Sequence, residues 1–308
     1  MKTLLEYADY LKRRMMLNPR SFIIYCILRT LVIITMVRQF MLGNYESVWI
    51  CALSLIMFMV PSFLEDKLMI KFPGIFEAII YIFIYAAEIL GEVNNFYVSL
   101  PGWDTMLHTA NGFLCAAIGF SLVYVLNNSS AKIELSPFYL ALVAFCFSMT
   151  IGILWEFAEC FADMFLGSDA QKDFIIQKFQ SVTLDPTNSQ IPIAVKDITE
   201  TVIRTASGEE IVIEGGYLDI GILDTMKDLF VNFIGATVFS VFGYIYVIQQ
   251  NTQKTLFARI AGSLMLRRRH KEDVPREIPE DVKEQLRKQP HILTISEFNR
   301  MLEERDSR

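Results

Sequence analysis

Acidic side chains and one histidine recur at helical spacing near the ends of three apolar segments. Asp104 is followed four residues later by His108, and Asp224 by Asp228. Residues three or four apart share one face of a helix, so each pair can offer two donor atoms to one ligand. Oxygen donors with a single imidazole suit a divalent cation of unspecified identity. The predicted metal ligands are Asp104, His108, Glu156, Glu159, Asp224 and Asp228.

The two segments that begin with Asp-Thr-Met resemble each other further along. Each has a polar residue at the fourth following position, then Asn111 or Asn232 one turn deeper, and then a glycine. Helix capping would explain Asp104 and Asp224 as well as a functional role does, because Asp is favoured at helix N-termini. Capping does not explain the deeper residues. Polar groups inside a membrane indicate a function or a buried partner, so Asn111 and Asn232 are predicted as supporting residues.

The elements that must position these residues are membrane-spanning helices. The composition is 53% hydrophobic and the mean hydropathy is positive, and a helix needs about 20 apolar residues to cross a bilayer. We therefore predict an all-α polytopic membrane protein with six transmembrane helices in contact with the lipid bilayer. The apolar segments lie at about 21–37, 47–64, 73–90, 105–126, 138–158 and 229–248.

Lys and Arg cluster before the first segment and after the last, as in Lys12, Arg13, Arg14 and Arg267 to Arg269. Positive residues favour the cytoplasmic side, which predicts a multi-pass protein of the cytoplasmic (inner) membrane with both termini cytoplasmic. The predicted parts are a basic N-terminus at 1–20, a six-helix domain at 21–250 and a cytoplasmic tail at 251–308. A small extracytoplasmic insert occupies 167–221 within the six-helix domain.

The insert and the tail have patterns of their own. Residues 201–205 and 210–214 alternate in a strand-like way around a Gly-containing turn, which predicts a β-hairpin. In the tail, Phe257, Ile260 and Leu264 recur at helical spacing beside basic residues, which predicts an interfacial helix. Thr294 and Glu297 fit a capping box before a short charged helix.

Two other classes of site are disfavoured. The cysteines lie in or beside the apolar segments without paired spacing, so they predict neither disulfides nor a zinc site. The net charge of −6 gives no basic surface for a nucleic acid. The cysteines are Cys26, Cys51, Cys115, Cys146 and Cys160.

Five carboxylates around one imidazole repel one another and require neutralisation. A divalent cation would supply it directly, and Arg38, Lys227 or protonated carboxylates could supply part of it. Arg29 lies in the middle of the first segment, where an unpaired cation is costly. Glu77 and Glu88 are candidate partners for Arg29.

At these residues the chain resembles the YjdF-type bacterial inner-membrane proteins. Their pattern comprises an Asp-x-x-x-His-x-x-x-Gly helix, a Glu-rich helix end and an Asp-Thr-x-x-Asp helix start followed by Gly-Ala. The resemblance covers about residues 20–250 and implies a supporting role for Asp219, although the insert of about 50 residues departs from the pattern. The matching residues are Asp104, His108, Gly112, Glu156, Glu159, Asp219, Asp224, Thr225, Asp228, Gly235 and Ala236.

The sixth segment is also similar to the Asp-rich helix of VanZ-like membrane proteins, which implies cell-envelope chemistry. Neither family brings an established reaction. The leading hypothesis is an outward-facing acidic pocket that binds a divalent cation and acts on an envelope lipid or glycan, the partner being a lipid head group or an envelope precursor. His108, Asp228 and Glu156 are its predicted catalytic residues. One alternative is a proton- or cation-coupled transporter, and another is a structural or assembly protein whose polar residues hold the helices together.

Overall fold

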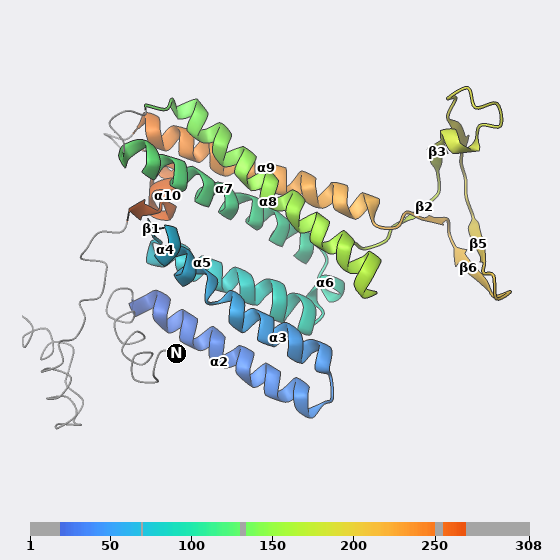
Figure 1. Cartoon of the computed structure of the whole chain (residues 1–308), viewed down its shortest axis with the longest axis horizontal. Coiled ribbons are helices and arrows are strands. Elements are labelled where there is room, and N and C mark those ends of the chain that lie inside the picture. The colour runs from blue at the N-terminus through green and yellow to red at the C-terminus, as the bar shows by residue number, and fades with distance from the viewer. Residues whose placement is uncertain (1–18, 69, 130–133, 250–254, 269–308) are drawn as a thin grey trace, which may run out of the picture. The chain divides into compact units, whose positions relative to one another are not determined.

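The computed structural model describes residues 19–68, 70–129, 134–249 and 255–268. Six helices in this part of the chain are long and apolar enough to cross a membrane, which confirms the predicted all-α polytopic fold (Figure 1). The capping box predicted at Thr294 and the basic stretch before Pro19 lie outside the described residues. The spans are Pro19–Met41, Tyr45–Glu65, Gly74–Val93, Trp103–Asn128, Pro137–Leu166 and Ile222–Ile248.

Several spans consist of more than one element. The second span contains α3 and most of α4, and the third contains α5 and a π-helical segment, η1. The helices are α2 (Pro19–Met41), α3 (Tyr45–Met57), α4 (Val60–Leu68), α5 (Gly74–Ile84), η1 (Tyr85–Val93), α6 (Phe96–Ser99), α7 (Trp103–Ser129), α8 (Pro137–Leu166), α9 (Ile222–Ile248) and α10 (Leu256–Leu264).

Helices α8 and α9 extend further than their apolar segments indicate. α8 begins after Ser136, whose side chain accepts a hydrogen bond from the Tyr139 amide, and ends at Gly167, whose φ of 70° is easily adopted only by glycine. It therefore reaches Leu166 and not about 158, and α9 begins at Ile222 and not at 229. Thirty residues at 1.5 Å each span about 45 Å, more than the roughly 30 Å of hydrocarbon. The extension of α9 carries Asp224, Lys227 and Asp228, and that of α8 carries Glu159.

The described chain divides into two compact units. In the first, to which 19–99 and 263–268 of the described residues belong, the rings of Tyr25, Phe58 and Tyr81 form an aromatic core. Strand β1 (Ile70–Lys71) pairs antiparallel with β8 (Arg267–Arg268). Large apolar side chains such as Ile34 and Phe40 are exposed on α2, as expected for a helix whose outer face contacts lipid.

Two polar groups within the spans of the first unit, the buried Glu77 and the half-buried Arg29, have polar or aromatic neighbours. Glu77 accepts hydrogen bonds from the Ser21 hydroxyl at 2.6 Å and the Tyr81 hydroxyl at 3.0 Å. Arg29 donates to the Tyr25 hydroxyl, and its guanidinium lies 5.7 Å from the centre of the Tyr25 ring. The hydroxyl and ring of Tyr25 therefore provide a local partner for a cation in the middle of a span.

The second unit, Leu100–Gly262, contains α7, α8 and α9 packed side by side (Figure 1). A Cβ atom at Gly112 would lie 2.1 Å from the Asn232 carbonyl oxygen, and one at Gly235 would lie 2.0 Å from that of Thr109. The backbones of α7 and α9 thus approach closely at two glycines, as small residues allow in membrane helices. This close approach brings the starts of α7 and α9 together.

The insert between α8 and α9 consists of short paired strands. β5 (Glu200–Arg204) and β6 (Glu210–Glu214) form the predicted hairpin, with Val202 opposite Val212. Two further pairs are not evident from the sequence: β2 (Ile175–Ile176) with β7 (Tyr217–Leu218), and β3 (Phe179–Ser181) with β4 (Ile193–Val195). A single 3₁₀ turn, η2 (Val182–Leu184), follows β3. We call the end of the helices to which this insert connects the insert end.

In the part of the tail that the structure describes, α10 forms at Leu256–Leu264, as the apolar spacing predicts. The Phe257 ring packs on Phe242 of α9 with 4.8 Å between ring centroids. The location of α10 at a membrane surface stays a prediction.

Candidate metal centre

Two donors of the candidate site come from the first turns of α7. Asp104 is the second residue of that helix, and His108 follows one turn later. Their spacing brings His108 Nε2 to 3.3 Å from Asp104 Oδ1. The helix alone therefore orients one carboxylate oxygen and one imidazole nitrogen toward a common point.

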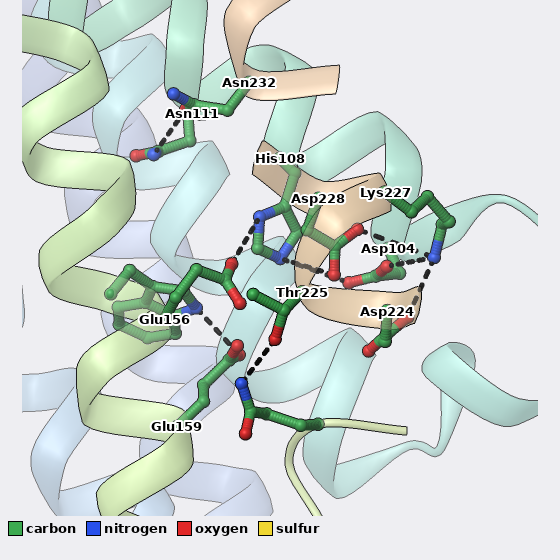
Figure 2. A network of polar contacts seen from close by, with 12 residues as sticks. Asp104, His108, Asn111, Glu156, Glu159, Asp224, Thr225, Lys227, Asp228 and Asn232 are labelled. Atoms are coloured by element: carbon green, nitrogen blue, oxygen red, sulfur yellow. Dashed lines mark hydrogen bonds and ion pairs between the residues drawn. The ribbon is translucent and has the colours of Figure 1, made fainter. Parts of the chain in front are cut away.

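The third donor comes from α9. Asp228 Oδ2 lies 3.7 Å from His108 Nε2, and Asp228 is 2% exposed. One donor atom each of Asp104, His108 and Asp228 lies within 4.8 Å of the other two (Figure 2). These residues could hold a metal ion, since a single ion could reach two carboxylate oxygens and one imidazole nitrogen.

Glu156 of α8 lies on the side of the His108 imidazole opposite Asp104 and Asp228, as Figure 2 shows. Its Oε1 is 3.9 Å from His108 Nδ1, and the residue is 4% exposed. Among the residues that the structure describes, Glu156 Oε2 has no hydrogen-bond partner. A histidine that binds a metal through one nitrogen usually has a carboxylate or carbonyl beside the other, and Glu156 has this position.

Lys227 is the cation at the centre of the aspartates. Its Nζ lies 3.0 Å from Asp104 Oδ2, 3.1 Å from Asp224 Oδ1 and 3.5 Å from Asp228 Oδ1. The sequence identified Lys227 only as one of several means of neutralisation. Because it is adjacent to Asp228 along the helix, the spacing pattern gave no sign that one ammonium contacts three aspartates.

Asp224 is not the N-cap of α9, contrary to the capping explanation. Gly221 is the N-cap, and Asp224 is the third helical residue. Its Oδ2 accepts a hydrogen bond from the Lys172 amide at 3.0 Å, while Oδ1 contacts Lys227. Asp224 thus connects the site to the first residues of the insert, and its position still suits the positive end of the helix dipole.

A layer of amides lies one turn below the three donors. Asn111 Nδ2 donates to Asn232 Oδ1 at 3.2 Å, and Asn232 is 1% exposed. Gly152 of α8 leaves room for this side chain, because a Cβ there would lie 2.7 Å from Asn232 Nδ2. The two predicted supporting residues therefore pair with each other across α7 and α9.

The remaining predicted residues lie further out or elsewhere. Glu159 accepts a hydrogen bond from Trp155 Nε1 at 2.8 Å and is half-buried, so it lies beside the site and outside the three-donor group. Arg38 and Arg29 belong to α2 in the first unit, and their supporting roles stay predictions.

Asp219 closes the base of the insert. Its carboxylate accepts hydrogen bonds from the amides of Phe174 at 2.7 Å, Leu223 at 2.9 Å and Gly221 at 3.3 Å. Burial alone would raise the pKa of Asp219, but these three amides stabilise the charged form and lower it. Asp219 therefore joins the end of the insert to the start of α9 and does not contribute a donor to the candidate centre.

Hydrogen bonds around Gln171, which was not singled out from the sequence, connect the insert to the site. Gln171 Nε2 donates to the Thr225 hydroxyl, and Asp163 accepts hydrogen bonds from the Ala170 and Gln171 amides at 2.6 and 2.8 Å. Segment 168–174 is thereby tied to the start of α9. Two sequence signals marked Thr225: the repeated Asp-Thr-Met and the Asp-Thr-x-x-Asp pattern of the resemblance.

Comparison with known proteins gives a family. No curated protein and no solved structure matches the chain. Residues 23–249 match the family described as "Predicted membrane protein (DUF2238)". The resemblance to YjdF-type and VanZ-like proteins is thus borne out only as membership of a membrane-protein family. With most of its length matched and six spans, this multi-pass integral membrane protein belongs to the DUF2238 family.

Proposed function

We propose that the protein binds a divalent cation at the insert end of α7 and α9 and uses it in hydrolysis or transfer at the polar part of an envelope lipid or glycan. The observation that carries the proposal is the convergence of Asp104, His108 and Asp228, whose donor atoms lie within 4.8 Å of one another. Two of the three residues are separated from the third by more than a hundred positions in the chain.

Unsatisfied buried oxygens support this proposal. Glu156 Oε2 and Asp228 Oδ1 are buried and have no hydrogen bond within the described chain. The Lys227 ammonium lies 3.5 Å from Asp228 Oδ1. A buried carboxylate without adequate partners is costly, and a bound cation would offset that cost.

Each residue has a distinct role in the proposed chemistry. A divalent cation polarises an ester or phosphoryl oxygen and makes a water more acidic. Asp104 and Asp228 would hold the cation together with His108 Nε2. Glu156 would orient the imidazole through Nδ1, from which its Oε1 lies 3.9 Å away.

The residues below the site favour entry of the ligand from the insert end. Beneath the Asn111–Asn232 layer the Phe239 ring lies 5.0 Å from that of Phe113 and 6.2 Å from that of Phe120, measured between centroids. Phe239 and Phe120 are completely buried. A transporter needs a polar path across the helices, and this aromatic cluster gives no support for one.

A purely structural network is the alternative with an observation in its favour, because Lys227 already contacts three aspartates. The Asp228→Asn variant distinguishes a metal site from a structural network. Titration of the purified protein with Mn²⁺, followed by electron paramagnetic resonance, should show a site in the wild type that is lost in the variant. If the variant instead binds Mn²⁺ normally and melts at a much lower temperature, the aspartate is structural.

We also propose that the insert faces outward, on the basis of the basic residues flanking the first and last spans. Asn188→Cys, placed in the insert of a chain whose five native cysteines are replaced by serine or alanine, should react with a membrane-impermeant maleimide on intact cells. Reaction only after the cells are opened would reverse the proposed orientation.

A further inference from the structure

Lys227 and His108 contact different oxygens of the same two carboxylates, those of Asp104 and Asp228. Asp104 presents Oδ1 to His108 and Oδ2 to Lys227. Asp228 presents Oδ2 to His108 and Oδ1 to Lys227. A cation held beside His108 Nε2 would therefore be bridged to the Lys227 ammonium by two aspartates. Bridging carboxylates between two positive centres are the usual arrangement of two-metal sites.

The charges of the three aspartates around Lys227 would be offset within the proposed site. Asp104, Asp224 and Asp228 carry three negative charges, which a divalent cation and one ammonium balance. Glu156 lies on the far side of the imidazole. Lys227 Nζ donates to Asp104 Oδ2 and Asp224 Oδ1 and lies 3.5 Å from Asp228 Oδ1 without a hydrogen bond. Within the described chain its third N–H is therefore open to a further oxygen ligand.

The surroundings of Lys227 indicate where such a ligand would come from. Leu223 and Phe230 lie four residues before and three after Lys227, hence on its side of α9, and they are 45% and 62% exposed. Ile234, one turn further, is 41% exposed. Lys227 thus lies between exposed apolar residues near the insert end of a membrane-spanning helix, where the phosphate of a lipid would lie beside acyl chains.

We infer that Lys227 and the bound cation form a two-cation clamp, bridged by Asp104 and Asp228, whose ligand is a phosphate group. The inference rests on the proposed cation site and names the substrate class for it. Two positive centres on either side of a phosphoryl group are the common means of binding it, and lysine is a frequent phosphate ligand. A neutral glycan would gain little from the ammonium.

The test uses the full-length protein in detergent, loaded with Mn²⁺. Inorganic phosphate and dihexanoyl phosphatidic acid serve as probes, and the broadening of their ³¹P resonances by bound Mn²⁺ reports a phosphorus atom beside the metal. The wild type should broaden the resonance of phosphatidic acid. Lys227→Met should bind Mn²⁺ at least as tightly, because a competing cation is removed, but bind phosphate about tenfold or more weakly, since one charge-assisted contact is lost.

Matched variants make the result specific. Lys227→Arg keeps the charge and should retain broadening, and Lys172→Met removes an exposed lysine that pairs only with Asp169 at 3.6 Å among the ion pairs of the described chain. Stronger broadening of phosphatidic acid than of inorganic phosphate supports a lipid source, and equal broadening supports the phosphate clamp with a soluble source.

The outcomes separate this inference from the proposed function. If Mn²⁺ binds the wild type but broadens neither probe, or broadens them equally in wild type and Lys227→Met, the clamp is wrong while the cation site stands. If the wild type binds no Mn²⁺, the cation site is wrong and the clamp with it.

Discussion

Adding one methyl group at Gly235 should disrupt the candidate metal centre without touching any of its ligands. A Cβ at this position would lie 2.0 Å from the Thr109 carbonyl oxygen and 2.9 Å from the Phe113 amide nitrogen of α7. Both obstacles are backbone atoms and cannot rotate away. Relief of the contact therefore requires α7 and α9 to separate.

The magnitude follows from the distances. To bring the Cβ from 2.0 Å to a tolerable 3.0 Å or more, the two helices must separate by about 1 Å, and overpacking of this kind typically costs about 1–3 kcal/mol. The donors of α7 and α9 face each other across this contact, His108 Nε2 being 3.7 Å from Asp228 Oδ2. We expect Gly235→Ala to lower the melting temperature by several degrees and to weaken Mn²⁺ binding by about tenfold or more, since an ångström of displacement is large for a metal ligand.

The assay compares thermal unfolding in detergent and Mn²⁺ affinity for the wild type, Gly235→Ala and Gly262→Ala. The last is a suitable control because its Cβ would meet the edge of the Tyr246 ring at 2.9 Å, a side chain that can move, and no backbone atom. If Gly235→Ala is as stable as the wild type and binds Mn²⁺ with the same affinity, the close approach of α7 and α9 does not determine the geometry of the site.

Two further predictions concern polar groups outside the centre. The pKa of Asp219 is lowered by three amides despite its burial, so its contribution to stability is present above the unfolded pKa of about 3.9 and is lost as pH falls below it. Pepsin cleavage in the insert should therefore accelerate between about pH 4.5 and 2.5, and Asp219→Asn should be cleaved readily already at the upper end of this range. An unchanged pH profile in that variant would contradict the role of the carboxylate. Ser21→Ala removes the 2.6 Å hydrogen bond to buried Glu77 and should lower the unfolding free energy by about 1–3 kcal/mol, measured by denaturant titration. Thr30→Val removes only an exposed hydrogen bond to the Cys26 carbonyl and should be nearly neutral. Equal effects of the two changes would contradict the argument.

The six helices were predictable because a bilayer imposes one strict requirement, a run of about 20 apolar residues per crossing. The helix ends were not, because α8 and α9 continue beyond their apolar segments into turns whose polar side chains contact other polar groups, such as Asp224 with Lys227. The hairpin β5–β6 was predictable from alternation around a turn, but β2 and β7 pair only two residues each across some 40 positions of sequence, and such short non-local pairing leaves no periodic signal.

The site was predictable to the extent that it depends on spacing within one helix. Asp104 with His108, and Asn111 one turn deeper, follow from the period of α7. Which residues meet across α7 and α9 depends on the glycine contacts between these helices, and these bring Asp228 to His108. Glu159 instead accepts a hydrogen bond from Trp155, four residues earlier on α8. The central position of Lys227 depends on the same glycine contacts.

The most direct test of the cation site is the metal content of the purified wild-type protein beside Asp228→Asn and Asp169→Asn, after dialysis with and without a chelator. Asp169 is an exposed residue of the insert paired with Lys172, so its variant controls for the loss of one carboxylate. We predict about one divalent metal ion per chain in the wild type and in Asp169→Asn, removed by chelator, and none in Asp228→Asn. Equal metal content in all three proteins, or none in the wild type after exposure to divalent metals, would contradict the assignment of Asp104, His108 and Asp228 as a metal centre.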